Sequence, residues 1–179
     1  MLETLTATRF VKAYGSGRTQ PLYLVCEDNL GEEYEVVVKL KGSPQLNAAG
    51  LLFEAYSSLL GAHLELPVLK SYKIEITQEF ADTVVQPEHR QTLQDSLGLN
   101  FGVAHWDPGF TIWPTDKSIP RTMKQAAQEI LAFDGIIQNP DRGGMKRNCV
   151  FRGEELIIYD HELAFTQFLE LFPKDPWET

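Results

Sequence analysis

Cysteine is scarce in this chain: its 179 residues include only Cys26 and Cys149. Their spacing fits neither a metal-ligand pair nor a redox pair, and a secreted disulfide framework needs more cysteines. The N-terminus shows no basic segment followed by an apolar one, and no apolar run approaches the roughly 20 residues of a membrane span. We therefore expect a cytoplasmic protein that has no signal peptide and does not contact a membrane.

Positive charge is also in short supply, because 16 Lys and Arg face 25 Asp and Glu, which gives a formal net charge of −9. Nucleic-acid-binding proteins meet phosphates with extended basic patches. The largest basic cluster here is Lys146-Arg147 with Arg142 just before it, which suits the phosphates of one nucleotide but no nucleic-acid surface. A simpler interpretation of the acidity is that it serves solubility alone.

Repeats and low-complexity linkers are absent too, and the chain is 43% apolar and 23% charged, as in a globular protein with one domain or two small lobes. Alternation and β-branched residues predict early strands, and three- and four-residue steps of apolar residues predict helices. The expected strands are 6–13, 22–27, 34–40 and 72–79, with a hairpin formed by 149–151 and 156–159. The expected helices are 46–60, 87–97 and 120–138, whereas 98–114 reads as irregular.

The later half of the chain carries the residues that point to chemistry. Asp141 and Asn148 lie in the loop after the long helix, and Asp160 directly follows the apolar strand 156–159. Magnesium prefers such hard oxygen ligands and commonly takes one or two carboxylates, with phosphates and water completing its shell. In phosphoryl transfer, one Asp orients the attacking hydroxyl, while an Asn and a second Asp hold the metal.

The earlier half supplies partners for phosphates. Lys39 ends the valine-rich strand, and Glu54 lies in the following helix, where it can fix the lysine through an ion pair. Gly15-Ser16-Gly17 falls between the first two strands and can lay backbone N–H groups over phosphates. Each residue also has a structural interpretation: a solvated Lys39, a surface Glu54 and an ordinary hairpin loop at Gly15.

The string from Phe133 to Arg142, then Asn148, then Ile157 to Phe165 resembles the HipA-like kinases and, more distantly, phosphatidylinositol kinases and protein kinases. The resemblance implies that Asp141 is the catalytic Asp, that Asn148 and Asp160 bind magnesium, and that Lys39 contacts the phosphates of ATP. It also implies an α+β, two-lobed protein-kinase-like fold. Its N-lobe, about 1–80, would hold an antiparallel sheet and one helix, and its small helical C-lobe, about 81–179, the catalytic loop and hairpin.

The chain departs from the common kinase pattern in two places. Asn148 follows Asp141 by seven positions where many kinases have five, and Lys146 occupies the fifth. Only 19 residues follow Asp160, so we expect a minimal kinase core, a reduced substrate lobe or a substrate lobe that comes from another chain. Arg142 is expected to brace the loop, with contact to a phosphate as the alternative, and Asp134 to be a structural hydrogen-bonding group. His161 is expected to pack locally, with a part in catalysis as the alternative.

Two functions from different classes remain open. The first is an ATP- and magnesium-dependent phosphotransferase that acts on Ser or Thr of a protein, for which the set Asp141, Asn148 and Asp160 argues. The second is a catalytically silent nucleotide-binding module that works through protein–protein interaction, for which the short C-terminal part argues. A phosphoinositide kinase is a third, but its membrane substrate calls for basic or apolar anchors, against which the acidic balance argues.

Overall fold

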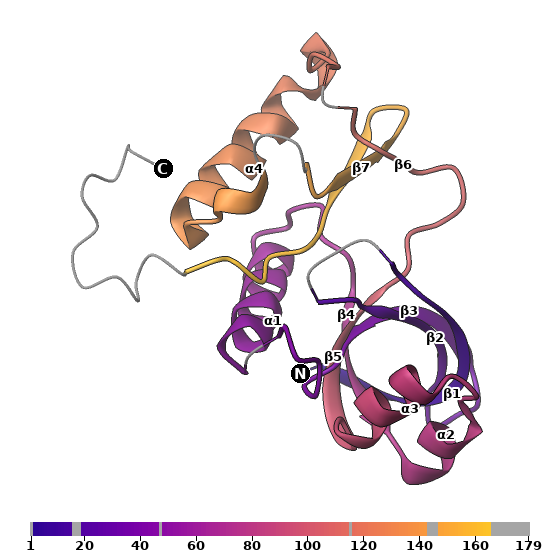
Figure 1. Ribbon diagram of the computed structural model, residues 1–179. Coiled ribbons are helices and arrows are strands. Elements are labelled where there is room, and N and C mark those ends of the chain that lie inside the picture. Colours follow the sequence, from indigo (N-terminus) through magenta and orange to yellow (C-terminus); the bar gives the residue numbers. More distant parts are fainter. Residues whose placement is uncertain (1, 16–18, 47, 115, 143–146, 166–179) are drawn as a thin grey trace, which may run out of the picture. The chain divides into compact units, whose positions relative to one another are not determined.

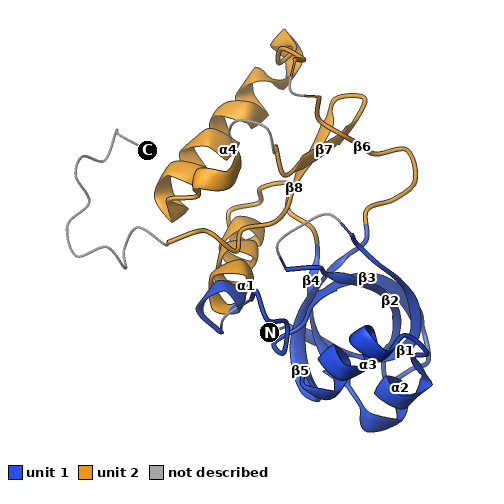
Figure 2. Ribbon diagram, viewed as in Figure 1, with its two compact units in different colours: residues 1–51, 70–105 blue, residues 52–69, 106–179 orange. Residues whose placement is uncertain are grey.

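The computed structural model describes residues 2–15, 19–46, 48–114, 116–142 and 147–165 (Figure 1). The chain forms two compact units: residues 1–51 and 70–105 make unit 1, and residues 52–69 and 106–179 make unit 2 (Figure 2). Each unit has its own hydrophobic core. Helix α1 (Ala48–His63) begins in unit 1 and continues in unit 2. In these described ranges, no helix is both long and apolar enough to span a membrane.

Unit 1 is a closed five-stranded barrel in which the strands follow the order β1-β2-β3-β5-β4. Neighbouring strands are antiparallel except β1 and β4, which run parallel with Leu5 opposite Ile74 and so close the barrel. The strands are β1 (Glu3–Ala13), β2 (Leu22–Glu27), β3 (Glu33–Lys39), β4 (Ser71–Ile76) and β5 (Gly98–Ala104).

Strand β1 is long enough to serve two neighbours. Its first residues pair with β4 and the residues from Thr6 onward pair with β2. The register against β2 shifts between Ala7 and Arg9 and again between Phe10 and Lys12. Such bulges bend a strand and increase its twist, which is what closing a sheet into a barrel requires.

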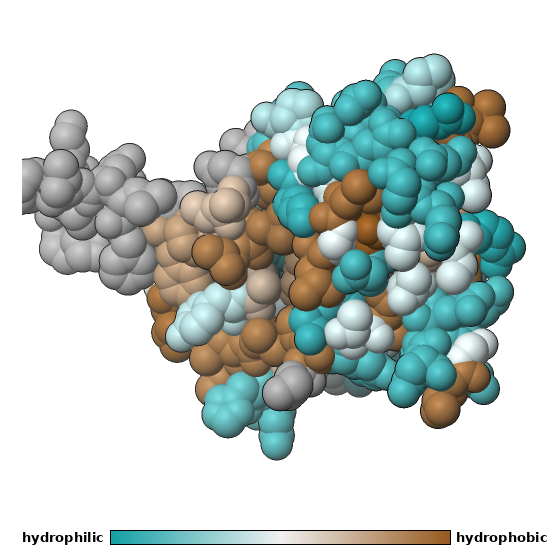
Figure 3. Space-filling model, turned by 90° about the horizontal axis from the view of Figure 1, so that it is seen from below, coloured by the Kyte–Doolittle hydropathy of each residue, from teal (hydrophilic) through white to brown (hydrophobic). Residues whose placement is uncertain are grey.

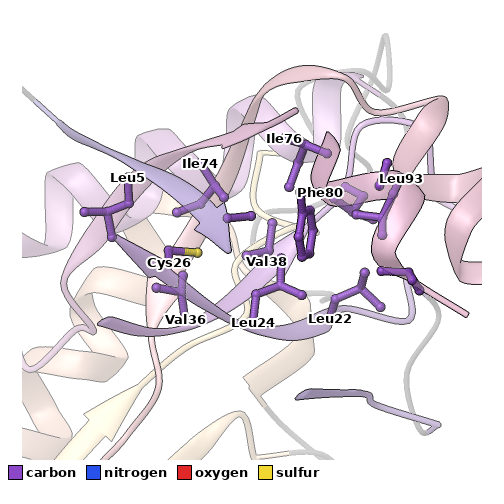
Figure 4. Packing of buried hydrophobic residues seen from close by; sticks show 14 of the residues in the cluster. Leu5, Leu22, Leu24, Cys26, Val36, Val38, Ile74, Ile76, Phe80 and Leu93 are labelled. Atoms are coloured by element: carbon purple, nitrogen blue, oxygen red, sulfur yellow. The ribbon is translucent and has the colours of Figure 1, made fainter. Parts of the chain in front are cut away.

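The barrel is filled by the inward-facing residues of its strands. On β4, for example, Tyr72, Ile74 and Ile76 are buried at every second position, as the period of a strand demands. Phe80 of α2 (Gln78–Thr83) and Leu93 of α3 (Pro87–Gln94) pack into the same cluster (Figure 4). The side chain of Thr77 caps α2, which begins inside the segment expected to be a strand, whereas Pro87 opens α3 as expected.

Unit 2 combines a helix with a small antiparallel sheet in the order β6-β7-β8. Its elements after α1 are β6 (Thr111–Ile112), the 3-10 helix η1 (Arg121–Met123), α4 (Lys124–Ile137), the 3-10 helix η2 (Pro140–Arg142), β7 (Cys149–Arg152) and β8 (Glu155–Ile158). Phe133 and Ile137 of α4 pack against Ile158 of β8 in the core. The backbone N–H of Ile158 also donates to the Pro67 carbonyl over 2.8 Å, which ties the end of β8 to the segment after α1.

Helix α1 turns a polar, small-residue face inward. Gly50, Glu54, Ser57, Ser58 and Gly61 are buried, whereas the apolar residues Leu52, Tyr56 and Leu59, on which the helix prediction partly rested, are exposed. Gly61 allows a close approach, because a Cβ there would lie 2.7 Å from Val68 Cγ1. The periodicity therefore located the helix but did not identify its buried face.

The expectation of a two-lobed protein-kinase-like fold with an antiparallel N-terminal sheet is wrong. The protein is a small α+β protein whose early strands close into a five-stranded barrel that includes a parallel pair. Strand β5, which lies between β3 and β4 in the barrel, falls in the segment that was expected to be irregular. Its glycines Gly98 and Gly102 and its Asn100 have low β-propensity, which hid the strand.

Replacing Gly102 by Ala is expected to destabilise the barrel. A Cβ at this buried position would lie 2.6 Å from Val36 Cγ1 and 2.8 Å from Ile74 Cγ1, so the core must shift to admit it. Overpacking of this kind typically costs about 1–3 kcal/mol of unfolding free energy. Gly135→Ala on α4 is the control: nothing lies within 4 Å of its Cβ, and the gain in helix propensity should stabilise the protein. Urea denaturation measures both changes, and equal stabilities for the two variants would contradict the packing of the barrel.

Candidate active site

The loop that follows α4 is held by the last turns of the helix. Gln138 caps α4 in a left-handed conformation (φ 51°), and Asn139 donates its backbone N–H to the Asp134 carbonyl over 2.9 Å. The Asn139 side chain donates from Nδ2 to Asp134 Oδ1 over 3.1 Å and accepts the backbone N–H of Asp141 over 3.2 Å. Asp141 therefore sits on a turn whose shape is set by hydrogen bonds to α4.

Arg142 ties this loop to the residues that directly precede β7 and directly follow β8. Its Nε donates to Asp134 Oδ2 over 2.7 Å, and both side chains are close to nine-tenths buried. Its Nη1 donates to the backbone carbonyls of Asn148 over 2.6 Å and Tyr159 over 3.3 Å. The interpretations of Arg142 as a brace and of Asp134 as a structural hydrogen-bonding group are thus confirmed.

Asn148 meets Asp141 directly. The Nδ2 of Asn148 donates to Asp141 Oδ2 over 3.0 Å and to the Asp141 carbonyl over 3.2 Å. Asn148 is buried and has a left-handed backbone (φ 42°), which Asn tolerates better than most residues. With the amide nitrogen engaged as a donor, the amide oxygen of Asn148 is the atom able to ligate a cation.

Asp160 belongs to the same network through its neighbour. The backbone N–H of Tyr159 donates to the Asn148 carbonyl over 3.0 Å, at the point where β8 ends. Asp160 then adopts a left-handed conformation (φ 60°). Burial, followed by the negative charge of Asp160, raises the pKa of Tyr159 to about 12. Backbone conformations of this kind carry some strain and tend to occur at functional sites, where surrounding contacts enforce them.

Glu54 contacts the residue after Asp160. Its Oε2 accepts the backbone N–H of His161 over 2.7 Å, and its Oε1 lies 3.8 Å from His161 Nδ1. Both side chains are almost completely buried, and the His161 ring packs edge-on against Phe133. No local pattern predicts this pairing of residues 107 positions apart. One usable signal was present, however: the small residues that flank Glu54 on one face of α1 indicate a closely packed surface.

The residues expected to bind phosphates belong to unit 1. Lys39 ends β3, where it is buried and pairs with Phe101 of β5. Gly15 follows β1 with open space around it, and Ser16 and Gly17 lie outside the described residues. Lys39 is in unit 1 and Glu54 in unit 2, so the ion pair between them stays a prediction.

The oxygen donors of this site fit magnesium better than a soft metal. The described residues contain no group of three or more His, Cys, Asp and Glu side chains that could form a complete metal site. Asp141, Asn148 and Asp160 would supply only two carboxylates and one amide, which is fewer such side chains than a complete metal site contains. This set matches magnesium, which usually takes one or two carboxylates and leaves the remaining positions to phosphates and water.

Breaking the buried pair of Asp134 and Arg142 is expected to destabilise unit 2. Asp134→Asn removes the carboxylate and leaves a nine-tenths-buried guanidinium without its counter-charge. Removing one partner of a buried ion pair typically costs about 3–5 kcal/mol of unfolding free energy. Urea denaturation followed by tryptophan fluorescence measures the loss, because Trp113 is buried in the core of unit 2.

The control for this substitution is Glu155→Gln in the exposed pair of Arg152 and Glu155, whose side chains are 45% and 62% exposed. Exposed ion pairs contribute about 0–1 kcal/mol, so this variant should unfold almost as the wild type does. Equal losses in the two variants would mean that the Arg142 brace does not hold the loop.

Comparison with known proteins agrees with the resemblance seen in the sequence. No curated protein matches the chain. A protein-family model described as HipA-like kinase matches residues 8–172. This range covers most of the barrel of unit 1 and the segment that carries Asp141, Asn148 and Asp160. The chain therefore belongs to the HipA-like kinase family, and this membership supports a kinase-like function in general.

Proposed function

We propose that the protein is an ATP- and magnesium-dependent phosphotransferase whose acceptor is a Ser or Thr hydroxyl of a protein. One observation carries the proposal: Asp141 and Asn148 share a hydrogen bond of 3.0 Å inside a network that also fixes the backbone next to Asp160. A carboxylate and an amide joined by a hydrogen bond, with a second carboxylate on the neighbouring backbone, suit the positioning that phosphoryl transfer requires.

Each of the three residues takes a separate role in this proposal. Asp141 accepts a hydrogen bond from the attacking hydroxyl and orients it towards the γ-phosphate. The amide oxygen of Asn148 and the carboxylate of Asp160 would hold magnesium, which supplies positive charge at the phosphates when it is bound. Arg142 holds the backbone at two points of this site in place by donating hydrogen bonds to the carbonyls of Asn148 and Tyr159.

The remaining expected contacts concern the phosphates of ATP. Lys39 would neutralise them, and the segment Gly15-Ser16-Gly17 would cover them with backbone N–H groups. Both assignments come from the family resemblance and the order of elements. Lys39→Met tests the first of them, because it keeps the apolar stem and removes the charge.

Calorimetric titration of the full chain with ATP, with and without magnesium, is the first test. We expect binding that strengthens when magnesium is added, followed by release of ADP when a protein acceptor is supplied. Mass spectrometry of the acceptor should then locate a phosphate on Ser or Thr. Failure to bind ATP in either condition would overturn the proposal.

A second candidate is a nucleotide-binding module that works by binding another protein without catalysis. The observation that favours it is the exposed row Leu52, Tyr56 and Leu59 on α1, with exposed fractions of 68%, 59% and 45%. Figure 3 shows hydrophobic side chains gathered on part of the molecular surface. Under this candidate, ATP binds but is never consumed, and Tyr56→Glu abolishes the interaction with the partner protein.

A further inference from the structure

Glu54 occupies an unusual place for a carboxylate. It is 2% exposed and sits on the small-residue face of α1. A buried charge is costly unless hydrogen bonds and opposite charges compensate it. Part of the compensation comes from the His161 backbone, whose N–H donates to Oε2 over 2.7 Å. Because this partner is a backbone group, Glu54 constrains the backbone conformation next to His161.

The hydrogen bond lies on the peptide group that follows Asp160. The peptide group that precedes Asp160 is held as well, because the Tyr159 carbonyl accepts Arg142 Nη1 over 3.3 Å. The Tyr159 N–H is fixed in turn by the Asn148 carbonyl. When both flanking peptide planes are fixed, the φ and ψ angles of the residue between them are fixed too.

Asp160 has a backbone conformation that usually needs support from its surroundings. Its φ of 60° lies in the left-handed region, which costs energy for residues that carry a Cβ, although Asn and Asp tolerate it better than most. Strained backbone of this kind persists only where surrounding contacts enforce it. Of the two clamps, Arg142 belongs to the loop after α4, whereas Glu54 comes from a helix about a hundred residues earlier in the chain.

We infer that Glu54 is a positioning residue that holds Asp160 in the conformation needed to ligate magnesium. The inference rests on the proposed function, since it takes Asp160 as a magnesium ligand. It is separate from the expected ion pair with Lys39, because it uses the ability of the carboxylate to accept a hydrogen bond and not its charge. The part of His161 that Glu54 holds is its backbone N–H. The His161 ring packs edge-on against Phe133 and anchors the segment there.

Two substitutions at Glu54 separate the hydrogen bond from the charge. Glu54→Gln keeps an oxygen that can accept the His161 N–H, whereas Glu54→Leu keeps the approximate volume and removes the acceptor. Ser57→Ala is the matched control, because Ser57 is fully buried on the same helix and its hydroxyl has no hydrogen-bond partner among the described residues.

Two readouts on the full chain are needed. Amide hydrogen exchange at His161, followed by NMR, reports the clamp without any ligand. In Glu54→Leu it should be faster by at least roughly tenfold, while Glu54→Gln and Ser57→Ala stay near wild type. Titration of magnesium at fixed ATP reports the consequence. The magnesium requirement for ATP binding should rise roughly 10- to 100-fold in Glu54→Leu and stay close to wild type in Glu54→Gln, whatever happens to turnover.

The possible results divide clearly. Unchanged exchange in Glu54→Leu would overturn the clamp, and faster exchange with an unchanged magnesium requirement would overturn its role at Asp160. Equal defects in the Gln and Leu variants would assign the effect to the charge of Glu54 and reject the hydrogen bond. If Glu54→Leu does not fold, a Gln variant with a raised magnesium requirement still refutes the inference. A wild-type chain that binds ATP without any need for magnesium would refute the proposed function itself, and the exchange data would then describe a purely structural contact.

Discussion

Asp141→Asn is expected to bind magnesium–ATP nearly as well as the wild type and to lose phosphoryl transfer by about 10²- to 10⁴-fold, the usual contribution of a general base. The substitution keeps the size of the side chain. It also keeps an oxygen that can accept the hydrogen bond from Asn148 Nδ2, which is 3.0 Å long in the wild type. It removes the negative charge that would accept the proton of the attacking hydroxyl. The effect should therefore appear in kcat and leave ATP affinity almost unchanged.

Asp116→Asn, a change of the same chemistry at an exposed position of unit 2, is the matched control and should leave transfer intact. Both variants can be compared by calorimetric titration with ATP and by the initial rate of phosphate transfer. A transfer rate of Asp141→Asn within a few-fold of the wild type would exclude Asp141 as the base.

Asp160→Asn is expected to weaken the magnesium-dependent part of ATP binding by more than about tenfold. Loss of a group that merely orients a metal ligand typically costs 10- to 100-fold in metal affinity, and loss of a ligand carboxylate should cost no less. Asn is the fitting replacement because it tolerates the left-handed backbone at φ 60° as Asp does. The fold should therefore survive, and a urea denaturation curve close to that of the wild type verifies this.

The same titration in the absence of magnesium provides the internal control for Asp160→Asn. Affinity without the metal should be similar in variant and wild type, or slightly higher in the variant, because a negative charge next to the phosphates has been removed. If the variant responds to magnesium as the wild type does, Asp160 is not a ligand, and the metal-binding role would have to move to other oxygens of the loop.

Much of the secondary structure follows from local patterns. The strand β2 (Leu22–Glu27) and the hairpin of β7 and β8 were predicted within about one residue, because alternation and a Gly153 turn are local signals. The closed barrel was not predictable in this way. Its closure depends on β5, which resembles a loop in sequence because Gly102 is needed where Val36 and Ile74 leave no room for a Cβ.

The sequence singles out the residues of the candidate site but not the contacts among them. The order of Asp141, Asn148 and Asp160 along the chain, together with a family resemblance, singled them out. The hydrogen bond between Asp141 and Asn148 spans a loop of seven positions, and no periodic pattern specifies how such a loop folds. The contact between Glu54 and His161 lies still further from local rules, since it joins a helix to the end of a hairpin.

The buried face of α1 shows why hydrophobic periodicity alone can mislead. Apolar residues at helical spacing usually mark the buried side of a helix. Here Leu52 and Tyr56 are exposed while Glu54 and Ser57 are buried, so the helix was found and its orientation was not. The buried carboxylate of Glu54 links this helix to the Asp160 segment by accepting the His161 N–H, and the hydrophobic pattern does not reveal a buried polar contact of this kind.

The most direct test of the kinase assignment is transfer of the γ-phosphate of ATP to a protein by the full chain, measured with and without magnesium. The acceptor is a serine- and threonine-containing protein mixture, and Asp141→Asn serves as the paired sample. We predict magnesium-dependent labelling of Ser or Thr by the wild type and its near-complete loss in Asp141→Asn. A wild-type chain that binds magnesium–ATP but transfers no phosphate, or labelling that is equal in the two proteins, would contradict the account.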